Sequence, residues 1–222
     1  MIKIQIKDIE KSIILNEIPM FLVIENFDFF HKIINNFLEN TSDISFIDLN
    51  YNSLRLQKNI LVISNYFDID IQSSKIIIDY IKNKHILTDE IISNDLARLY
   101  NDCVSFIKKL QYEIPYDIEY ATGINLDYLI KSLNVVPIIG NNRIETIINY
   151  CKINSEVYEK KIMVFVNINA YYSSNEISII TSELYNLGIY SIFISSNDIN
   201  IKQLSNKNII YVDNDLCEFY SD

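Results

Sequence analysis

The sequence has few of the residues that usually mark turns, with only three glycines and three prolines among 222 residues. Its turns must therefore be formed largely by Asn, Asp and Ser, which tolerate left-handed and turn geometries. Cys103, Cys151 and Cys217 are widely separated, which argues against a disulfide framework or a paired-cysteine metal site and favours buried apolar roles. His31 and His85 also lie far apart, so zinc-hydrolase sites and histidine-based catalytic triads are not supported.

Long apolar runs are absent as well. The longest runs, residues 18–24 and 162–166, fall far short of the roughly 20 residues that a membrane-spanning helix needs. The first residues alternate between apolar and polar side chains and lack the apolar block and cleavage site of a signal peptide. We therefore expect a cytoplasmic protein.

Acidic residues outnumber basic ones, and the formal net charge is -10. The surface as a whole would repel duplex DNA at long range. Any DNA binding must therefore be local, with Lys and Arg side chains gathered on one face or with bound cations that cancel part of the acidic charge. The hydrophobic content of 49% is sufficient for a core of ordinary size.

Short apolar runs alternate with helical patterns in both halves of the chain. The run at residues 20–25 is followed by Phe and Ile at helical spacing over residues 28–39, which predicts a strand and then a helix. The other predicted strands are residues 44–49, 60–64, 161–167, 189–195 and 208–212, with further helices at 175–187 and near 201–204. This alternation indicates an α/β fold with a mostly parallel sheet covered on both faces.

The middle of the chain changes to long helices, beginning near Ser73 and resuming after Thr88. Apolar residues then recur at alternating spacings of four and three, which gives one narrow stripe of coiled-coil type: Ile92, Leu96, Leu99, Cys103, Phe106 and Leu110. Such a helix, about 38 Å long over residues 88–113, requires a partner helix, and residues 144–158 could return alongside it. We predict an α/β head domain from residues 1–72 and 160–222 and a helical leg domain from residues 73–159.

A nucleotide site at the first predicted strand is not supported. The turn after that strand, residues 26–29, has no glycine to wrap a phosphate and no Lys-Ser/Thr pair after it. The strand at 161–167 ends in Asn167, where a nucleotide hydrolase would usually have a carboxylate for its metal. The sheet is therefore interpreted as degenerate P-loop-like or unrelated to that fold, and no catalytic residue is predicted.

Acidic side chains crowd a short, broken segment after the long helix: Glu113, Asp117, Glu119 and Asp127, together with Asn125. Oxygen ligands in an irregular loop suit calcium, which takes about 6 to 8 oxygens in flexible geometry. The segment lacks the ligand order and the glycine of an EF-hand. The same pattern is also typical of a solvated acidic turn.

Basic side chains provide the complementary signal on the predicted helices. Those on the long helix lie away from the apolar stripe, and those on the preceding helix are seven residues apart and share one face. All five are candidates for phosphate binding: Lys75, Lys82, Arg98, Lys108 and Lys109. Asp79 and Asp95 are interleaved with them, so a merely solubilising helix face is the alternative interpretation.

Several local strings, taken in their order and spacing, resemble the csn-two family of type II-A CRISPR adaptation proteins. They cover nearly the whole chain and lie at residues 21–25 (FLVIE), 61–64 (LVIS), 67–74 (FDIDIQSS), 117–120 (DIEY), 129–133 (LIKSL) and 161–167 (KIMVFVN). No single string is a catalytic signature, so the resemblance depends on the set.

The resemblance implies an α/β head of degenerate nucleotide-binding type, a helical leg, and four copies closed into a ring around linear double-stranded DNA. It also implies calcium at the junction of head and leg, no catalytic activity, and cooperation with the spacer integrase complex and the effector nuclease. By position, Asp117 and Glu119 match the family's calcium-binding segment, and Asp127 matches it more loosely. The family tends to continue with acidic residues where this chain has Ala121, Thr122 and Gly123.

The sequence thus predicts a non-catalytic, sequence-independent, calcium-supported protein that binds DNA ends during spacer acquisition. Two alternatives stay open. One is a degenerate P-loop protein that binds or hydrolyses nucleotides, and the other is a scaffold that contacts only proteins.

Overall fold

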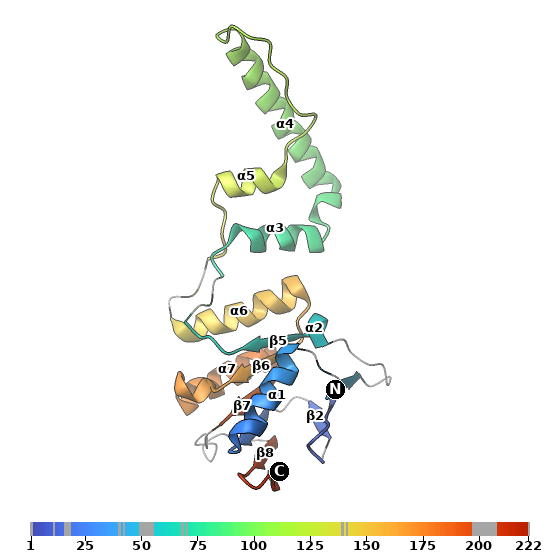
Figure 1. The fold of residues 1–222 in the computed structure, drawn as a ribbon. Coiled ribbons are helices and arrows are strands. Elements are labelled where there is room, and N and C mark those ends of the chain that lie inside the picture. The colour runs from blue at the N-terminus through green and yellow to red at the C-terminus, as the bar shows by residue number, and fades with distance from the viewer. Residues whose placement is uncertain are drawn as a thin grey trace. The chain divides into compact units, whose positions relative to one another are not determined.

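The structure is a computed structural model, and it describes residues 2–10, 12–15, 19–39, 41, 43–48, 56–67, 69, 71–138, 140, 142–196 and 208–221 (Figure 1). The chain forms two compact units. The first unit comprises Met1–Ile69 and Ile139–Asp222, and the second comprises Asp70–Ile138. The expected boundary after residue 72 lies close to the first of these limits, whereas the expected end of the insertion at residue 159 lies well beyond the second.

A six-stranded, mostly parallel sheet forms the centre of the first unit. Its strands are β3 (Met20–Ile24), β5 (Ile60–Ile63), β6 (Ile162–Val166), β7 (Tyr190–Ser195), β8 (Asn208–Val212) and β9 (Glu218–Ser221). Their order is β5-β6-β7-β3-β8-β9, and only β9 runs antiparallel to its neighbour. The predicted α/β class with a mostly parallel sheet is therefore confirmed.

A second, antiparallel sheet in the same unit has the order β2-β1-β4, from β1 (Ile2–Ile6), β2 (Ile13–Leu15) and β4 (Ile44–Asp48). The strand predicted at residues 44–49 belongs here and not to the parallel sheet. Burial alternates along β4, where Ile44 and Phe46 are buried and Ser45 is half-buried. Such alternation is typical of a sheet that is covered on one face only.

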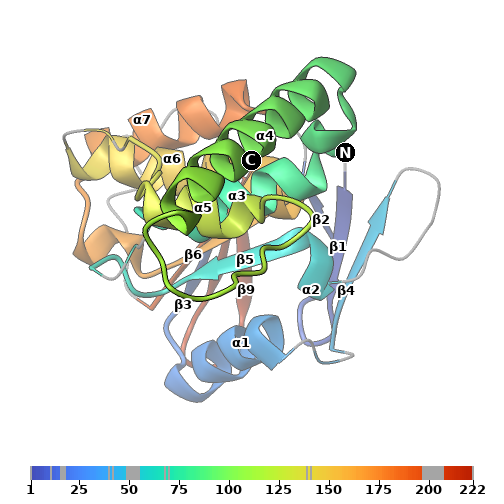
Figure 2. The same cartoon turned by 90° about the horizontal axis from the view of Figure 1, so that it is seen from above.

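Helices cover both faces of the parallel sheet, which Figure 2 shows from above. They are α1 (Phe27–Glu39) on one face and α6 (Arg143–Tyr158) and α7 (Ser174–Asn186) on the other, with short segments α2 (Leu56–Asn59) and η2 (Ile168–Ala170) between elements. Successive residues of β3 alternate between two apolar clusters: Leu22 packs with α1 and the small sheet, and Phe21 packs with α6 and α7. All five residues of β3 are buried, which explains its uninterrupted apolar sequence.

An aromatic stack crosses three strands on the face covered by α6 and α7. The ring centroid of Phe193 lies 4.8 Å from that of Phe21 and 5.0 Å from that of Phe165. Cys151 is buried in the same cluster, as expected for an apolar role, whereas Cys103 and Cys217 are exposed, so that expectation is wrong for two of the three cysteines.

The second unit contains α3 (Ser74–Asn83), η1 (Ile86–Thr88), α4 (Glu90–Gln111) and α5 (Leu126–Ser132). Ser73 caps α3 by accepting from Lys75 N, and Asp89 caps α4 by accepting from the backbone N–H groups of Ile91 and Ile92. These caps lie where the sequence predicted the helix starts. The helix over residues 144–158 does not belong to this unit, because α6 packs against α7 in the first unit.

Left-handed backbone is carried mainly by residues other than glycine. Alongside Gly188, the described residues with positive φ are His85, Asn134, Glu159, Asn167 and Leu216. The two asparagines agree with the expected use of Asn in turns, and the other three were not expected. No helix within the described segments combines the length and apolarity that crossing a bilayer requires.

The helix predicted near residues 201–204 lies outside the described residues.

Candidate nucleic-acid interface

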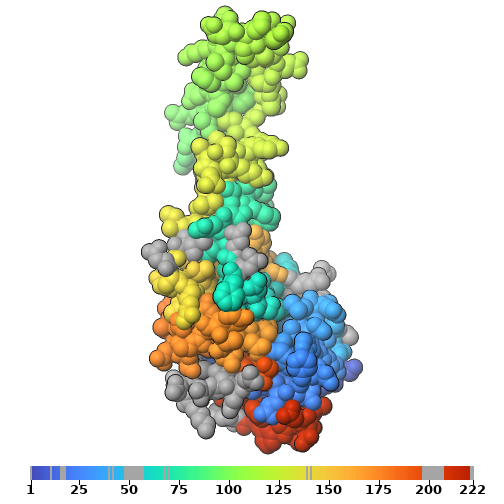
Figure 3. Space-filling view, turned by 60° about the vertical axis from the view of Figure 1, so that its left-hand side comes forward, coloured from blue at the N-terminus to red at the C-terminus, as the bar shows by residue number. Residues whose placement is uncertain are grey.

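The long helix α4 has no buried residue among its 22. Leu96, Tyr100 and Val104 are half-buried at helical spacing. The irregular segment that follows α4 runs back along the helix (Figure 1). Tyr100 fixes that segment by donating a 3.0 Å hydrogen bond from its hydroxyl to the carbonyl of Ala121. On the face seen in Figure 3, side chains of α4 and the segment after it (green) are open to the surface.

All five basic residues named from the sequence lie in the second unit, and three of them are paired with carboxylates. The pairs are Lys75 with Asp79 (2.7 Å), Lys82 with Asp127 (2.5 Å) and Arg98 with Asp95 (3.3 Å). Such exposed pairs are weak, so a phosphate can compete for the same cations. They nevertheless lower the positive potential that these three side chains present.

Lys108 and Lys109 differ from the other three. Both are exposed in the last turn of α4, and no carboxylate in the described part of the chain forms an ion pair with either. Part of their role is local, since cations at a helix C-terminus stabilise the helix dipole. Their charges remain available to an external anion, which makes them the strongest phosphate-binding candidates of the five.

The four acidic residues predicted to bind metal are not gathered into one cluster. Glu113, Asp117 and Glu119 are exposed on the irregular segment after α4, and Asp127 lies in the first turn of α5, paired with Lys82. Within the described ranges, no three His, Cys, Asp or Glu side chains come together as a metal site. Calcium binding stays a prediction.

Three exposed aromatic residues lie near the two lysines in the sequence; Phe106 was predicted only as part of the apolar stripe, and Tyr112 and Tyr116 were not singled out. The exposed fractions of Phe106, Tyr112 and Tyr116 are 60%, 90% and 76%. Aromatic faces beside lysines can stack on nucleic-acid bases. The closeness of these aromatic residues to Lys108 and Lys109 in the sequence could have pointed to them. Because the chain has 16 tyrosines, this local grouping did not stand out.

The carboxyl end of β3 is the other place where a ligand is expected, since the connections diverge there as at a switch point of an open parallel sheet. Asn26 occupies the N-terminus of α1, with its Oδ1 accepting from Phe29 N at 2.9 Å. The Glu25 carboxylate lies beside it and accepts from the Tyr211 hydroxyl and from Asn214 Nδ2. The Asn26 side chain thus caps α1, and the negative charge of Glu25 beside it disfavours the binding of a phosphate.

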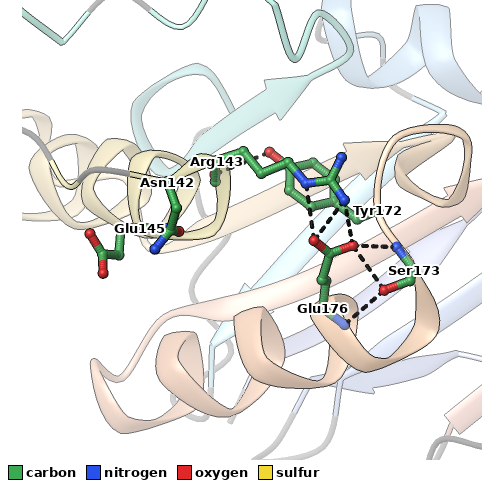
Figure 4. Close-up of polar contacts among 6 residues, drawn as sticks. All are labelled: Asn142, Arg143, Glu145, Tyr172, Ser173 and Glu176. Atoms are coloured by element: carbon green, nitrogen blue, oxygen red, sulfur yellow. Dashed lines mark hydrogen bonds and ion pairs between the residues drawn. The ribbon is translucent and has the colours of Figure 1, made fainter.

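A third polar group joins the N-termini of α6 and α7 (Figure 4). The Arg143 guanidinium binds both carboxylate oxygens of Glu176 at 2.7 and 2.8 Å and lies 5.3 Å from the centre of the Tyr172 ring. Ser173 caps α7 in a capping box, and its N–H and hydroxyl both donate to Glu176 at 2.8 Å. Because Arg143 and Glu176 neutralise each other, we assign this group to stability.

The Glu176 carboxylate predicts a specific acid dependence. The Ser173 backbone N–H, then Arg143 and the Ser173 hydroxyl, lower its pKa from 4.5 to about 2. The folded state therefore gains stability from ionised Glu176 above about pH 4.5, and loses it as the pH falls toward 2. The measurement is urea unfolding at a series of pH values across this range. Glu176→Gln is expected to be less stable than the unmodified protein at pH 7, and its free energy of unfolding should fall less steeply toward low pH.

Glu183→Gln, on the exposed side of α7, is the matched control because it removes one carboxylate from the same helix. Its stability is expected to follow that of the unmodified protein across the acid range. If the free energies of unfolding of Glu176→Gln and of the unmodified protein fell in parallel as the pH is lowered, the contacts of Glu176 with Arg143 and Ser173 would not be what holds the carboxylate ionised.

A scan against models of known protein families and a search of curated proteins both give no match to this chain.

Proposed function

We propose that this chain is a non-catalytic protein of the csn-two type that binds the ends of linear double-stranded DNA during CRISPR spacer acquisition. The observation that carries the proposal is the pair of exposed lysines, Lys108 and Lys109, on a helix with no buried residue. A chain of net charge -10 can attract DNA only through such a local group of cations.

The finer description of the fold is part of the same proposal. The first unit would be a head of degenerate P-loop-like type and the second unit its leg. The support at β3 is chemical: Asn26 caps α1 where a phosphate would bind, and Glu25 stands beside it. Both features suit a sheet that has lost nucleotide chemistry.

Lysines that contact phosphates without reading bases give affinity that falls steeply with salt and shows no sequence preference. Four copies closed into a cytoplasmic ring would multiply the contacts, and a closed ring must load from a DNA end. Calcium, the spacer integrase complex and the effector nuclease are the further partners that the family resemblance implies.

A mobility-shift comparison of linear and covalently closed circular duplexes, with calcium or with a chelator, tests the proposal beside a mass measurement of the assembly. We expect a tetramer that retains linear DNA, more strongly with calcium, and that does not retain closed circles. Equal retention of circles would reject threading, and a monomer under every condition would reject the ring.

A chain that shifts no DNA even at low salt would instead support the scaffold that contacts only proteins. The exposed apolar side chains of α4 are the observation that favours this second candidate.

A further inference from the structure

The chain passes from the first unit to the second after Ile69 and returns at Ile139. There are thus two connections: the outgoing connection begins with Tyr66, and the incoming connection ends with Arg143. Both of these residues contact the same side chain of the first unit, Tyr172, which lies just before the N-cap of α7. All of these contacts lie within the first unit.

Tyr66 fixes the outgoing connection to the sheet. The centre of its buried ring lies 4.7 Å from that of the Tyr171 ring and 5.8 Å from that of the Tyr172 ring. Its hydroxyl is within hydrogen-bonding distance of two strand-end carbonyls, Ile63 at 3.2 Å and Val166 at 3.0 Å. Burial raises the pKa of Tyr66, so the hydroxyl keeps the proton that it donates to these carbonyls.

Tyr172 holds the incoming connection through both the backbone and the side chain of Arg143 (Figure 4). The Tyr172 hydroxyl donates to the Arg143 carbonyl at 3.3 Å, and the guanidinium lies 5.3 Å from the centre of the ring. The same guanidinium binds Glu176, and that carboxylate also accepts from the backbone N–H of Ser173. The first turn of α6 is therefore joined to the residues around the start of α7.

The ion pair between Arg143 and Glu176 would by itself explain the stability of the two helix starts. It does not account for the Tyr172 ring, which is only 5% exposed and has Tyr66 on one connection and Arg143 on the other as neighbours. Loss of packing at one connection therefore removes support from the other. Segments that share contacts in this way open as one cooperative unit.

We infer that Tyr171 and Tyr172 form a clamp on both connections of the second unit, so that the outgoing and incoming connections are released together and not separately. The clamp is a conformational device of the first unit. It goes beyond the proposed DNA binding and does not depend on it. The attachment of the second unit would loosen in one step, before the parallel sheet unfolds.

Hydrogen exchange in the full-length protein, measured by mass spectrometry, tests whether the release is joint. Tyr171→Leu alters contacts with the outgoing connection, and Glu176→Gln alters contacts with the incoming one. Each change is expected to speed exchange of protected amides about fivefold in both segments, residues 60–67 and residues 143–150. A rise confined to the segment nearer the altered residue would show two independent contacts and overturn the inference.

The unmodified protein provides a second test. Protected amides of the two segments are expected to share one free energy of opening, lower than that of the amides in β3 and β7. If both segments exchanged only as slowly as β3 and β7, global unfolding alone would release them, and the inference would fail.

Two further variants complete the experiment. Tyr172→Phe keeps the ring and removes only the hydroxyl contact with the Arg143 carbonyl, yet it should speed exchange in residues 60–67 as well as 143–150. Phe219→Leu is the control, because β9 lies at the opposite edge of the parallel sheet from β5. It should leave exchange in both segments unchanged, and an equal rise there would contradict a local clamp.

Discussion

Lys108→Glu combined with Lys109→Glu is expected to weaken binding of linear duplex DNA at least about tenfold at fixed salt. Both lysines are exposed and lie outside any core cluster, so the chain should remain folded. Each subunit would lose two cations and gain two carboxylates at the place where phosphates are proposed to bind. The dependence of affinity on salt should also become shallower, because fewer counterions are released.

The control is Lys3→Glu combined with Lys152→Glu, which makes the same change in net charge on exposed positions of the first unit. This control should retain most of the affinity if binding is local to α4. Unchanged DNA affinity in the α4 variant would place the interface on another surface.

Phe193→Ala is expected to lower the free energy of unfolding of the first unit by about 3–5 kcal/mol. The ring is fully buried and stacks on Phe21 of β3 and on Phe165 of β6, so its removal leaves a cavity beneath α6 and α7. The two ring contacts add to the loss of buried area, since stacked aromatic pairs contribute about 0.5–1.5 kcal/mol each beyond burial.

Urea unfolding followed by circular dichroism measures the effect. Phe67→Ala, at a position that is 86% exposed, is the control and should change stability by less than about 1 kcal/mol. A loss below about 1 kcal/mol for Phe193→Ala would mean that the neighbouring side chains close the cavity.

The parallel sheet could be predicted because its strands are short apolar runs that turn residues separate. The edge strand β9 (Glu218–Ser221) could not, since Glu218 and Ser221 interrupt the pattern and only its pairing with β8 makes it a strand. The position of α6 was also outside the reach of periodicity. Its apolar residues predict a buried face and do not specify whether α4 or α7 covers it.

The ion pairs at the candidate interface could likewise be predicted only in part from the sequence. Two of the three ion pairs are local, Lys75 with Asp79 and Arg98 with Asp95, and the interleaved acidic residues were visible in the sequence. The pairing of Lys82 with Asp127 joins residues far apart in the chain and depends on the packing of α3 against α5. Helix geometry alone therefore could not tell that Lys108 and Lys109 would stand apart from the other three.

The contrast between the three cysteines offers a way to follow opening of the molecule. Cys151 lies on the buried face of α6, and its burial raises the pKa of the thiol, whereas Cys103 and Cys217 are exposed. A thiol reagent can therefore reach two sulfurs in the native state, and the third only when the core transiently opens. The slow phase of such labelling records the opening free energy of the sheet domain, separately from events on the long helix.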